Sequence, residues 1–385
     1  MPNSVRVSSS LIFIAIEFFG HNTYSTLALI IYFFSFTGQS PDSNLKYLSN
    51  LDKQMLQSLL TEPLKIQFTK SMVPRPRENE VLIRLHMVGI CGSDVHMFRN
   101  GHSHDGPLTI GHEGVGVIVN VGSGINEDRV GERVVIEPNI PCLRCPECRK
   151  GKGNICRNKR KIGVSEHGCF AEYVTVPGEF AHRLPDSIED QNAVVIEPAT
   201  VALSALKRSN IKPGETIAVV GLGAIGILLT HAARAFGYRV LVTDLVDSKI
   251  KMAVEMGAEY VSGDLETAYR EAKVAAVFEC AGSGKSATLA IQSAPRGADV
   301  IVLGLSEDPA SFSPRLLSQK GNSIIPSLIY DHPVDFQRCI YLVEKGILNP
   351  GFVVTRYYSL EELPEALKEA QKGEEGKIVI RVSDH

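Results

Sequence analysis

The feature that most constrains the fold is a glycine-rich segment between a strand pattern and a helix pattern. The apolar run Thr216–Val220 leads into it and the helical run Ile227–Phe236 follows. Between the two runs stand Gly221, Leu222, Gly223, Ala224, Ile225 and Gly226. A G-x-G-x-x-G spacing is weak evidence by itself, but between a strand and a helix it is typical of dinucleotide binding. We therefore expect a β-α-β unit of a parallel sheet here.

Each glycine in this segment has a distinct physical reason. Gly221 permits a tight turn, Gly223 lets backbone N–H groups approach a pyrophosphate, and Gly226 lets the helix pack closely on the strand. The N-terminus of the helix adds partial positive charge for the phosphates. The pattern thus predicts a binding site built largely from backbone.

An acidic residue about 20 positions further on completes the pattern. Asp244 follows the apolar run Arg239–Thr243. Its carboxylate can accept hydrogen bonds from ribose hydroxyls and would repel a 2′-phosphate, which favours NAD over NADP. Lys249, one turn into the next helix, is a second candidate contact to the ribose.

The alternation of strand and helix patterns continues toward the C-terminus. Ala275–Glu279, Asp299–Leu303 and Asn322–Leu328 read as further strands with helical sequence between them. Such alternation predicts an α/β fold with a doubly wound parallel (Rossmann) sheet, whose ligands bind beyond the carboxyl ends of the strands. We expect Leu303 and Leu305 to border the nicotinamide.

Half of the eight cysteines crowd into one short segment, at Cys142, Cys145, Cys148 and Cys156. Two disulfides within so short a segment would strain it, whereas tetrahedral zinc takes four thiolates at about 2.3 Å. Nearby lysines and arginines favour the thiolate form. We therefore predict a closed, structural zinc site, which in turn suggests a reducing compartment such as the cytoplasm.

Three other segments carry metal-binding residue types. Cys91 lies in Gly89–His96, His112 and Glu113 follow Gly111, and Glu197 precedes Pro198. Taken singly, each is a weak signal, because a buried cysteine is usually inert packing.

Their combination resembles the zinc-dependent medium-chain alcohol dehydrogenases. The family signature G-H-E-x2-G-x5-G-x2-[IV] is met at Gly111, His112, Glu113, Gly116, Gly122 and Ile125. The resemblance covers about residues 55–385. It implies a GroES-like, β-rich catalytic domain over 55–198 that includes the four-cysteine lobe, an NAD-binding Rossmann domain over 199–332, and a C-terminal segment, 333–385, that completes the catalytic domain. It also implies a homodimer or homotetramer.

The resemblance assigns roles in a second, catalytic zinc site. It makes Cys91 and His112 zinc ligands, and Asp94 the group that orients His112. Glu197 stands where classical alcohol dehydrogenases place a second cysteine, as in the polyol and threonine dehydrogenase branch. Glu113 is either a direct ligand or a near neighbour that exchanges with substrate.

The implied reaction is oxidation of an alcohol. Zinc with an open position acts as a Lewis acid that lowers the pKa of the substrate hydroxyl, and the nicotinamide accepts the hydride. Ser93 would take up the proton and pass it by way of the nicotinamide ribose to His96, whose ordinary pKa suits release to solvent.

The carboxylate of Glu197 favours a substrate that chelates zinc through neighbouring oxygens. We therefore expect a secondary alcohol of a polyol-like molecule; L-threonine, a vicinal diol or a sugar-alcohol phosphate stays an alternative. Two other functional classes are a zinc-free reductase, which usually lacks both zinc motifs, and a zinc-ribbon interaction module, which would leave the glycine-rich loop unexplained.

Residues 1–54 differ from the rest of the chain. Their apolar runs, Leu11–Phe19 and Leu27–Phe36, are shorter than the roughly 20 residues that a membrane span needs. These residues are interpreted as a disordered tail, an accessory helix or translated sequence upstream of the natural start, and the last is favoured. A chain beginning at Met55 is therefore expected to fold and be active. The net charge of −3 provides no basic field for nucleic acid, and we expect neither nucleic acid nor membrane as a partner.

Overall fold

The computed structural model describes residues 53–383 of the 385-residue chain. The extension predicted for residues 1–54 therefore lies almost wholly outside the described residues. None of the helices within 53–383 combines the length and the apolar character that a membrane span requires.

A six-stranded parallel sheet forms the nucleotide-binding region, in the order β12-β11-β10-β13-β14-β15. Its strands are β10 (Thr216–Val220), β11 (Arg239–Thr243), β12 (Glu259–Tyr260), β13 (Val274–Glu279), β14 (Asp299–Val302) and β15 (Ser323–Pro326). This strand order, with its reversal between β10 and β13, is that of a doubly wound dinucleotide-binding fold. The predicted fold class is confirmed. Only β12 had no counterpart in the sequence patterns, since it has two residues, both exposed.

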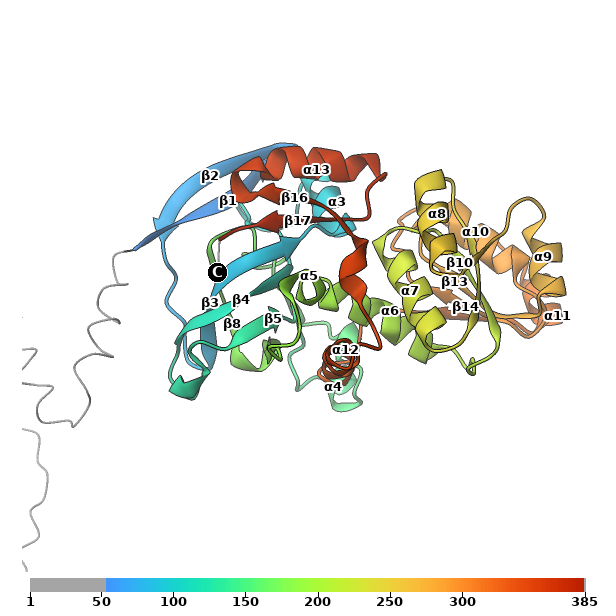
Figure 1. Ribbon diagram of the computed structural model, residues 1–385, viewed down its shortest axis with the longest axis horizontal. Coiled ribbons are helices and arrows are strands. Elements are labelled where there is room, and N and C mark those ends of the chain that lie inside the picture. Colours follow the sequence, from blue (N-terminus) through green and yellow to red (C-terminus); the bar gives the residue numbers. More distant parts are fainter. Residues whose placement is uncertain (1–52, 384–385) are drawn as a thin grey trace, which may run out of the picture. The chain divides into compact units, whose positions relative to one another are not determined.

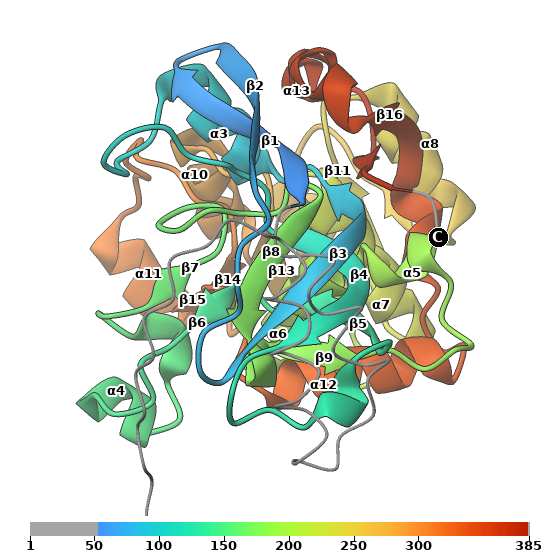
Figure 2. The ribbon, with the colours of Figure 1, turned by 90° about the vertical axis from the view of Figure 1, so that its left-hand side faces the viewer.

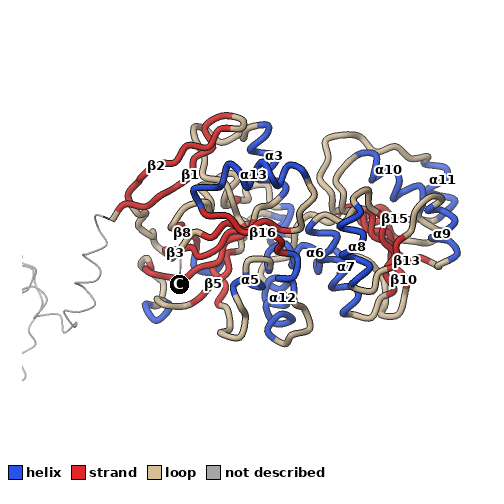
Figure 3. Tube along the Cα trace, turned by 45° about the horizontal axis from the view of Figure 1, so that its top comes forward, coloured by secondary structure: helices blue, strands red, loops and turns tan. Residues whose placement is uncertain are grey.

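Helices cover both faces of this sheet (Figure 1). α7 and α8 lie on one side and α9, α10 and α11 on the other, while Figure 3 shows the strands bundled between them. The bounds are α7 (Ala224–Ala235), α8 (Asp247–Glu255), α9 (Leu265–Glu271), α10 (Gly284–Ser293) and α11 (Pro314–Lys320). α7 begins three residues before the predicted Ile227, because its first turn lies inside the glycine-rich segment.

A seven-stranded sheet forms the second region, in the order β16-β17-β3-β4-β5-β9, with β8 also paired to β3. Its strands are β3 (Glu80–Gly89), β4 (Glu113–Val121), β5 (Arg133–Ile136), β8 (Tyr173–Pro177), β9 (Ala181–Arg183), β16 (Val354–Ser359) and β17 (Lys377–Arg381). The last strand, β17, runs antiparallel to β3 and pairs Val379 with Gly89. Residues from the end of the chain thereby come beside the segment that holds Cys91.

Smaller elements surround this sheet (Figure 2). They are the hairpin β1 (Gln54–Glu62) and β2 (Lys65–Met72), the pair β6 (Asn139–Ile140) and β7 (Arg160–Lys161), and the helices α3 (Gly92–Asn100), α4 (Pro146–Arg149), α5 (Asp190–Ala193) and α13 (Leu363–Lys372). Short 3-10 helices occupy Glu127–Arg129, Gly153–Ile155, Gly178–Phe180, Pro350–Val353 and Leu360–Glu362.

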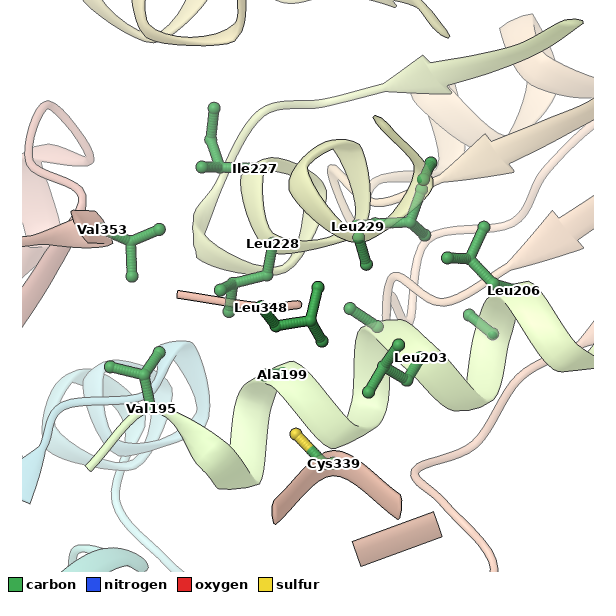
Figure 4. Packing of buried hydrophobic residues seen from close by; sticks show 14 of the residues in the cluster. Val195, Ala199, Leu203, Leu206, Ile227, Leu228, Leu229, Cys339, Leu348 and Val353 are labelled. Atoms are coloured by element: carbon green, nitrogen blue, oxygen red, sulfur yellow. The ribbon is translucent and has the colours of Figure 1, made fainter. Parts of the chain in front are cut away.

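Helix α6 (Ile196–Arg208) links the two regions and packs against α7 and α12 (Val334–Glu344). Figure 4 shows its apolar side chains, among them Ala199 and Leu203, facing Leu228 of α7 and Cys339 of α12. Leu203 and Leu228 are almost fully buried, and each such side chain contributes about 1.5–3 kcal/mol to folding. This packing fixes the first turn of α6, where Glu197 stands.

Candidate active site

Three metal-binding side chains converge where β3 ends and β4 begins, two neighbouring inner strands of the second sheet. Cys91 precedes α3, His112 lies just before β4, and Glu113 is the first residue of β4. One ligand atom from each lies within 4.8 Å of the other two. His112 and Glu113 are buried and Cys91 is partly buried. We call these three residues the catalytic cluster.

Asp94 fixes the backbone on both sides of the catalytic cluster. It is fully buried on the first turn of α3, and its carboxylate accepts hydrogen bonds from the backbone N–H of Cys91 (2.9 Å) and of Gly111 (3.1 Å). Its Oδ1 also lies 3.3 Å from His112 Nδ1, within ion-pair range but without hydrogen-bond alignment. Burial acts to lower the pKa of His112, but the charges of Asp94 and Cys91 outweigh it and raise that pKa well above its usual value.

Glu113 is held by a lysine from the far end of the chain. Lys377 Nζ donates to Glu113 Oε1 at 2.7 Å and to the Ile90 carbonyl at 3.0 Å. Both side chains are almost completely buried. Burial acts to lower the pKa of Lys377, but Glu113 and Cys91 outweigh it and raise that pKa, so the amine stays protonated. Glu113 Oε2 is buried and accepts no hydrogen bond.

The space around Glu113 admits only glycine at position 89. A Cβ on Gly89 would lie 2.1 Å from Glu113 Oε2, a distance that no real contact reaches. Because Gly89 of β3 has no side chain, there is room beside its backbone for Oε2 of Glu113.

Glu197 lies near the catalytic cluster without belonging to it. Among the described residues, the group within 4.8 Å contains Cys91, His112 and Glu113, and Glu197 is not part of that group. Burial raises the pKa of Glu197 to about 7; the charge of His112 acts in the opposite direction and that of Glu113 in the same direction. The hydroxyl of Tyr330, which accepts a hydrogen bond from Asn139 Nδ2 at 3.1 Å, approaches this carboxylate.

The two candidate relay residues share one exposed helix. Ser93 and His96 are three positions apart on α3, and both are exposed. His96 Nδ1 lies 3.1 Å from Asn100 Nδ2. Residues three apart lie on the same face of a helix. The two side chains are therefore neighbours beside Cys91.

The four-cysteine lobe, Cys142–Cys156, brings four sulfur atoms together. All of them lie within 4.8 Å of one another, and Cys145 Sγ is 3.4 Å from Cys148 Sγ and 3.8 Å from Cys156 Sγ. None of the four is in a disulfide. The turns around α4 also aim backbone N–H groups at sulfur, from Cys142 to Cys156 and from Cys148 to Cys145.

The protonation of these thiols is unequal. A backbone hydrogen bond from Arg144 lowers the pKa of Cys142 to about 6. The backbone of Cys148 acts to lower the pKa of Cys145, but burial and neighbouring side chains outweigh it and raise that pKa to about 12. Metal binding requires cysteine ligands in the thiolate form, so a bound cation would favour ionisation of these thiols.

The lobe is attached to the segment that carries Tyr330. Asn154, buried between the third and fourth cysteines, donates from Nδ2 to the Leu328 carbonyl at 3.2 Å. Asn139, at the base of the lobe, donates to the Tyr330 hydroxyl. These two hydrogen bonds thus connect the four-cysteine lobe to the segment around Tyr330, which lies close to Glu197.

The glycine-rich segment has the local geometry of a phosphate cradle. Gly221 has φ +94°, a conformation that suits glycine, and a Cβ there would lie 2.5 Å from the Cβ of Ala281. A Cβ on Gly226 would lie 2.0 Å from the Gly221 carbonyl oxygen, whereas Gly223 faces open space. Gly223 is also the N-cap of α7 and supplies no side-chain cap. The first N–H groups of α7 therefore stay available to an anion.

Asp244 lies directly after β11 and its carboxylate reaches back to this loop. Oδ2 accepts from the Leu222 N–H, and Oδ1 accepts from Leu245 (2.7 Å) and Val246 (2.9 Å). Lys249 lies in the first turn of α8 and is partly exposed. The acid thus stabilises the loop itself, a role that the sequence pattern did not reveal.

The ends of β13 and β14 lie side by side in the sheet, next to β10. Leu303 is 8% exposed and Leu305 is 78% exposed. Buried Glu279 closes β13 by accepting hydrogen bonds from the N–H groups of Ala281 and Gly282. The Leu305 side chain is therefore exposed, while Leu303 mainly packs in the core.

Sequence reasoning missed two residues of this site, Lys377 and Tyr330. Lys377 is a lone charge at the start of an apolar strand, and a buried charge usually has a partner. That signal could have indicated a buried ion pair but not its partner, 264 positions away. Tyr330 lies in a loop between β15 and α12 with no local signal of its own.

Two family models match the chain. Residues 77–186 match the alcohol dehydrogenase GroES-like domain, and residues 224–345 match the zinc-binding dehydrogenase domain. These two ranges contain the catalytic cluster, the four-cysteine lobe and most strands of both sheets, while β10, β16 and β17 lie outside them.

Full-length relatives agree with the family models. The sorbitol dehydrogenase of Bacillus subtilis (strain 168) is 30% identical over 333 residues, which are 83% of this chain and 94% of that protein. An alcohol dehydrogenase of E. coli CFT073, solved with NADH, has a TM-score of 0.81 and 28% identity, covering 86% and 99% of the two chains. A zinc-binding dehydrogenase from Sinorhizobium meliloti 1021, solved with NADP, has a TM-score of 0.81 and 29% identity, covering 86% and 100%. With both domain types matched and the metal-binding residues in place, the chain belongs to the zinc-dependent medium-chain alcohol dehydrogenase family.

Proposed function

We propose that this protein is a zinc-dependent, NAD-using dehydrogenase that oxidises a secondary alcohol of a small polyol-like substrate. The observation that carries the proposal is the catalytic cluster. Cys91, His112 and Glu113 meet in a buried setting, where Glu113 Oε2 has no hydrogen-bond partner. A buried carboxylate oxygen without a partner is costly, and a bound cation would offset that cost.

The donor set suits zinc, which takes thiolate, imidazole and carboxylate ligands. In the proposal Cys91 and His112 hold the ion, Glu113 or Glu197 supplies a carboxylate, and Asp94 orients His112. When bound, zinc supplies Lewis acidity that favours loss of the alcohol proton as hydride passes to the nicotinamide. Lys377 donates a hydrogen bond to Glu113 Oε1 and so fixes this carboxylate beside Cys91 and His112.

Proton removal is assigned to α3. Ser93 would take up the proton of the substrate hydroxyl as it gives up its own, and His96 would release a proton to solvent. The exposure of both side chains supports this direction. A His96→Gln variant should lower kcat, because the amide cannot take up and release a proton; an unchanged kcat would contradict the relay.

The nicotinamide cofactor is assigned to the loop Gly221–Gly226, with Asp244 and Lys249 at the ribose and Leu303 and Leu305 near the nicotinamide. Relatives have been solved with NADH and with NADP, so cofactor choice needs a test. Asp244→Ala should raise the NADP-to-NAD ratio of kcat/KM by about tenfold or more, equivalent to about 1.4 kcal/mol. Asp247→Ala, on exposed α8, is the matched control and should leave the ratio unchanged.

The proposed substrate class depends on whether the site offers a cation to a negatively charged substrate. A substrate such as L-threonine brings a carboxylate that needs a cation. Lys377, the lysine that contacts the catalytic cluster, is buried and already engaged by Glu113 and the Ile90 carbonyl. Glu197 and Tyr330 instead offer oxygen groups that suit hydroxyls. The similarity to a sorbitol dehydrogenase supports the same choice.

The four-cysteine lobe is assigned a structural zinc. Its four thiolates fill a tetrahedral shell and leave no position for substrate. A reducing compartment such as the cytoplasm suits these thiols, since all eight cysteines are free. We expect a homodimer or homotetramer, which light scattering of the purified protein would measure.

The decisive experiment is a comparison of kcat/KM for sorbitol, xylitol, L-threonine and ethanol with NAD, together with the zinc content. We expect a polyol to give the highest value and both assigned clusters to hold zinc. L-Threonine ahead by about tenfold would overturn the substrate class. Ethanol ahead would overturn the role of Glu197, and absence of zinc would overturn the function as a whole.

A further inference from the structure

A third group of metal-binding side chains lies outside both sites described so far. Glu137 follows the end of β5, His182 is the middle residue of β9, and His332 stands between β15 and α12. One ligand atom from each lies within 4.8 Å of the other two. Because these residues are 45 and 195 positions apart in the chain, only the folded structure brings them together.

The polar atoms of this group point at one place. His182 Nε2 lies 2.7 Å and His332 Nδ1 lies 2.8 Å from the same atom, Glu137 Oε2. The side chain of Glu137 is fully buried, and its other oxygen, Oε1, accepts no hydrogen bond. Two imidazoles therefore crowd one carboxylate oxygen while the second oxygen stays unsatisfied, which is costly in a buried setting.

Aromatic packing holds both imidazole rings in this orientation. Phe180 stacks on His332 with ring centroids 4.4 Å apart, and Phe336 stacks on His182 at 4.8 Å. Phe180 and Phe336 are themselves fully buried. The donor atoms are thus pre-arranged, and their rings have little freedom to turn toward other partners.

We propose that Glu137, His182 and His332 bind a divalent transition-metal ion, with zinc as the ion of choice. Two imidazole nitrogens and one carboxylate oxygen form a ligand set that zinc and neighbouring first-row metals accept. A cation would interact favourably with the buried carboxylate of Glu137, whose Oε1 accepts no hydrogen bond. The ion would be additional to those assigned to the catalytic cluster and the four-cysteine lobe.

The position of this ion gives it a structural task. Glu137 and His182 belong to the second sheet, whereas His332 belongs to the segment that leaves the nucleotide-binding sheet after β15. Two residues before His332 stands Tyr330, which approaches Glu197. The metal would therefore link β5 and β9 to the β15–α12 connection and hold Tyr330 at the active site.

Metal content of the purified full chain tests the proposal directly. After exhaustive desalting, inductively coupled plasma mass spectrometry should give three metal ions per wild-type chain and two for His182→Gln and for His332→Gln. The control His104→Gln removes a histidine of an outer loop and should keep all three. Two ions in the wild type, or three in both cluster variants, would overturn the proposal.

A second measurement holds even if the variants fold poorly. Crystals of the wild-type chain, grown without added metal, should show an anomalous difference peak at the zinc absorption edge between Glu137 Oε2, His182 Nε2 and His332 Nδ1. Peaks in the two other sites with none here would overturn the proposal. The result does not depend on turnover, so loss of the proposed alcohol oxidation and loss of this metal site are distinguishable.

Discussion

The four-cysteine lobe and the catalytic cluster both contain cysteines, but they are built in opposite ways. The lobe takes all four sulfurs from Cys142–Cys156, a stretch of 15 residues, and its helix α4 is four residues long. The catalytic cluster takes Cys91 from just before α3 and His112 and Glu113 from the start of β4, and hydrogen bonds to Asp94 and from Lys377 hold these segments. The lobe is a local structure, whereas the cluster depends on the whole fold.

This difference explains their exposure and their expected roles. Three of the four lobe cysteines are partly exposed, while His112, Glu113 and Lys377 are buried. A closed four-thiolate shell serves to stabilise a loop, whereas a buried set of three ligands leaves room for chemistry. The two regions should therefore respond differently to the loss of one ligand.

The largest effect is expected at Cys91. Cys91→Ala should lower kcat/KM by about a thousandfold or more, since a Lewis acid is worth several kcal/mol and each 1.4 kcal/mol is tenfold. Circular dichroism and the unfolding midpoint should stay near the wild type. Cys339→Ala removes a buried thiol outside both clusters and serves as the control. Turnover near wild type in Cys91→Ala would contradict the proposal that the catalytic cluster, unlike the lobe, takes part in the chemistry.

Cys145→Ser should show the reverse pattern. Loss of a closed zinc site coupled to folding should lower the thermal midpoint by roughly 10 °C, corresponding to several kcal/mol. The fraction that stays folded at low temperature should retain catalytic-cluster zinc and measurable turnover. If heat stability is unchanged while turnover vanishes, then the lobe takes part in the chemistry and the comparison fails.

Lys377→Gln tests how far the catalytic cluster depends on the buried contact between Lys377 and Glu113. Removing one partner of a buried ion pair leaves Glu113 uncompensated and should cost about 3–5 kcal/mol in the free energy of unfolding. Zinc at the catalytic cluster should weaken while the lobe keeps its ion. The exposed pair of Lys372 with Glu369 supplies the control, because Lys372→Gln should change stability by less than about 1 kcal/mol. Equal effects of the two variants would contradict the role of Lys377.

The smallest effect concerns the link between the two regions. Asn154→Ala removes the hydrogen bond from the lobe to Leu328 and should lower stability by about 1 kcal/mol in urea unfolding. Any loss of turnover should stay within about fivefold, the rate equivalent of that energy. Asn158→Ala, at an exposed position two residues after Cys156, should change neither quantity. A hundredfold loss of turnover in Asn154→Ala would show tighter coupling than the structure supports.

The sequence by itself was sufficient wherever the information is local. Strand, glycine loop and helix succeed one another in the chain, so β10 and β11 were predicted with their observed bounds, and β15 only somewhat too long. The spacing of Cys142–Cys156 likewise predicted four sulfurs in one place, since turns of a few residues can bring them together. The match of Gly111–Ile125 to a family signature added the second domain and the family.

Only the tertiary structure decided which distant residues meet. Neither the pairing of Lys377 with Glu113 nor the approach of Tyr330 to Glu197 has a local pattern, because each joins segments from different strands and loops. The group of Glu137, His182 and His332 was invisible for the same reason. A buried charge requires a partner, but the sequence does not say where the partner lies; strand order and the packing of α6 decide that, since they bring the C-terminal strand and the β15–α12 connection to the same place.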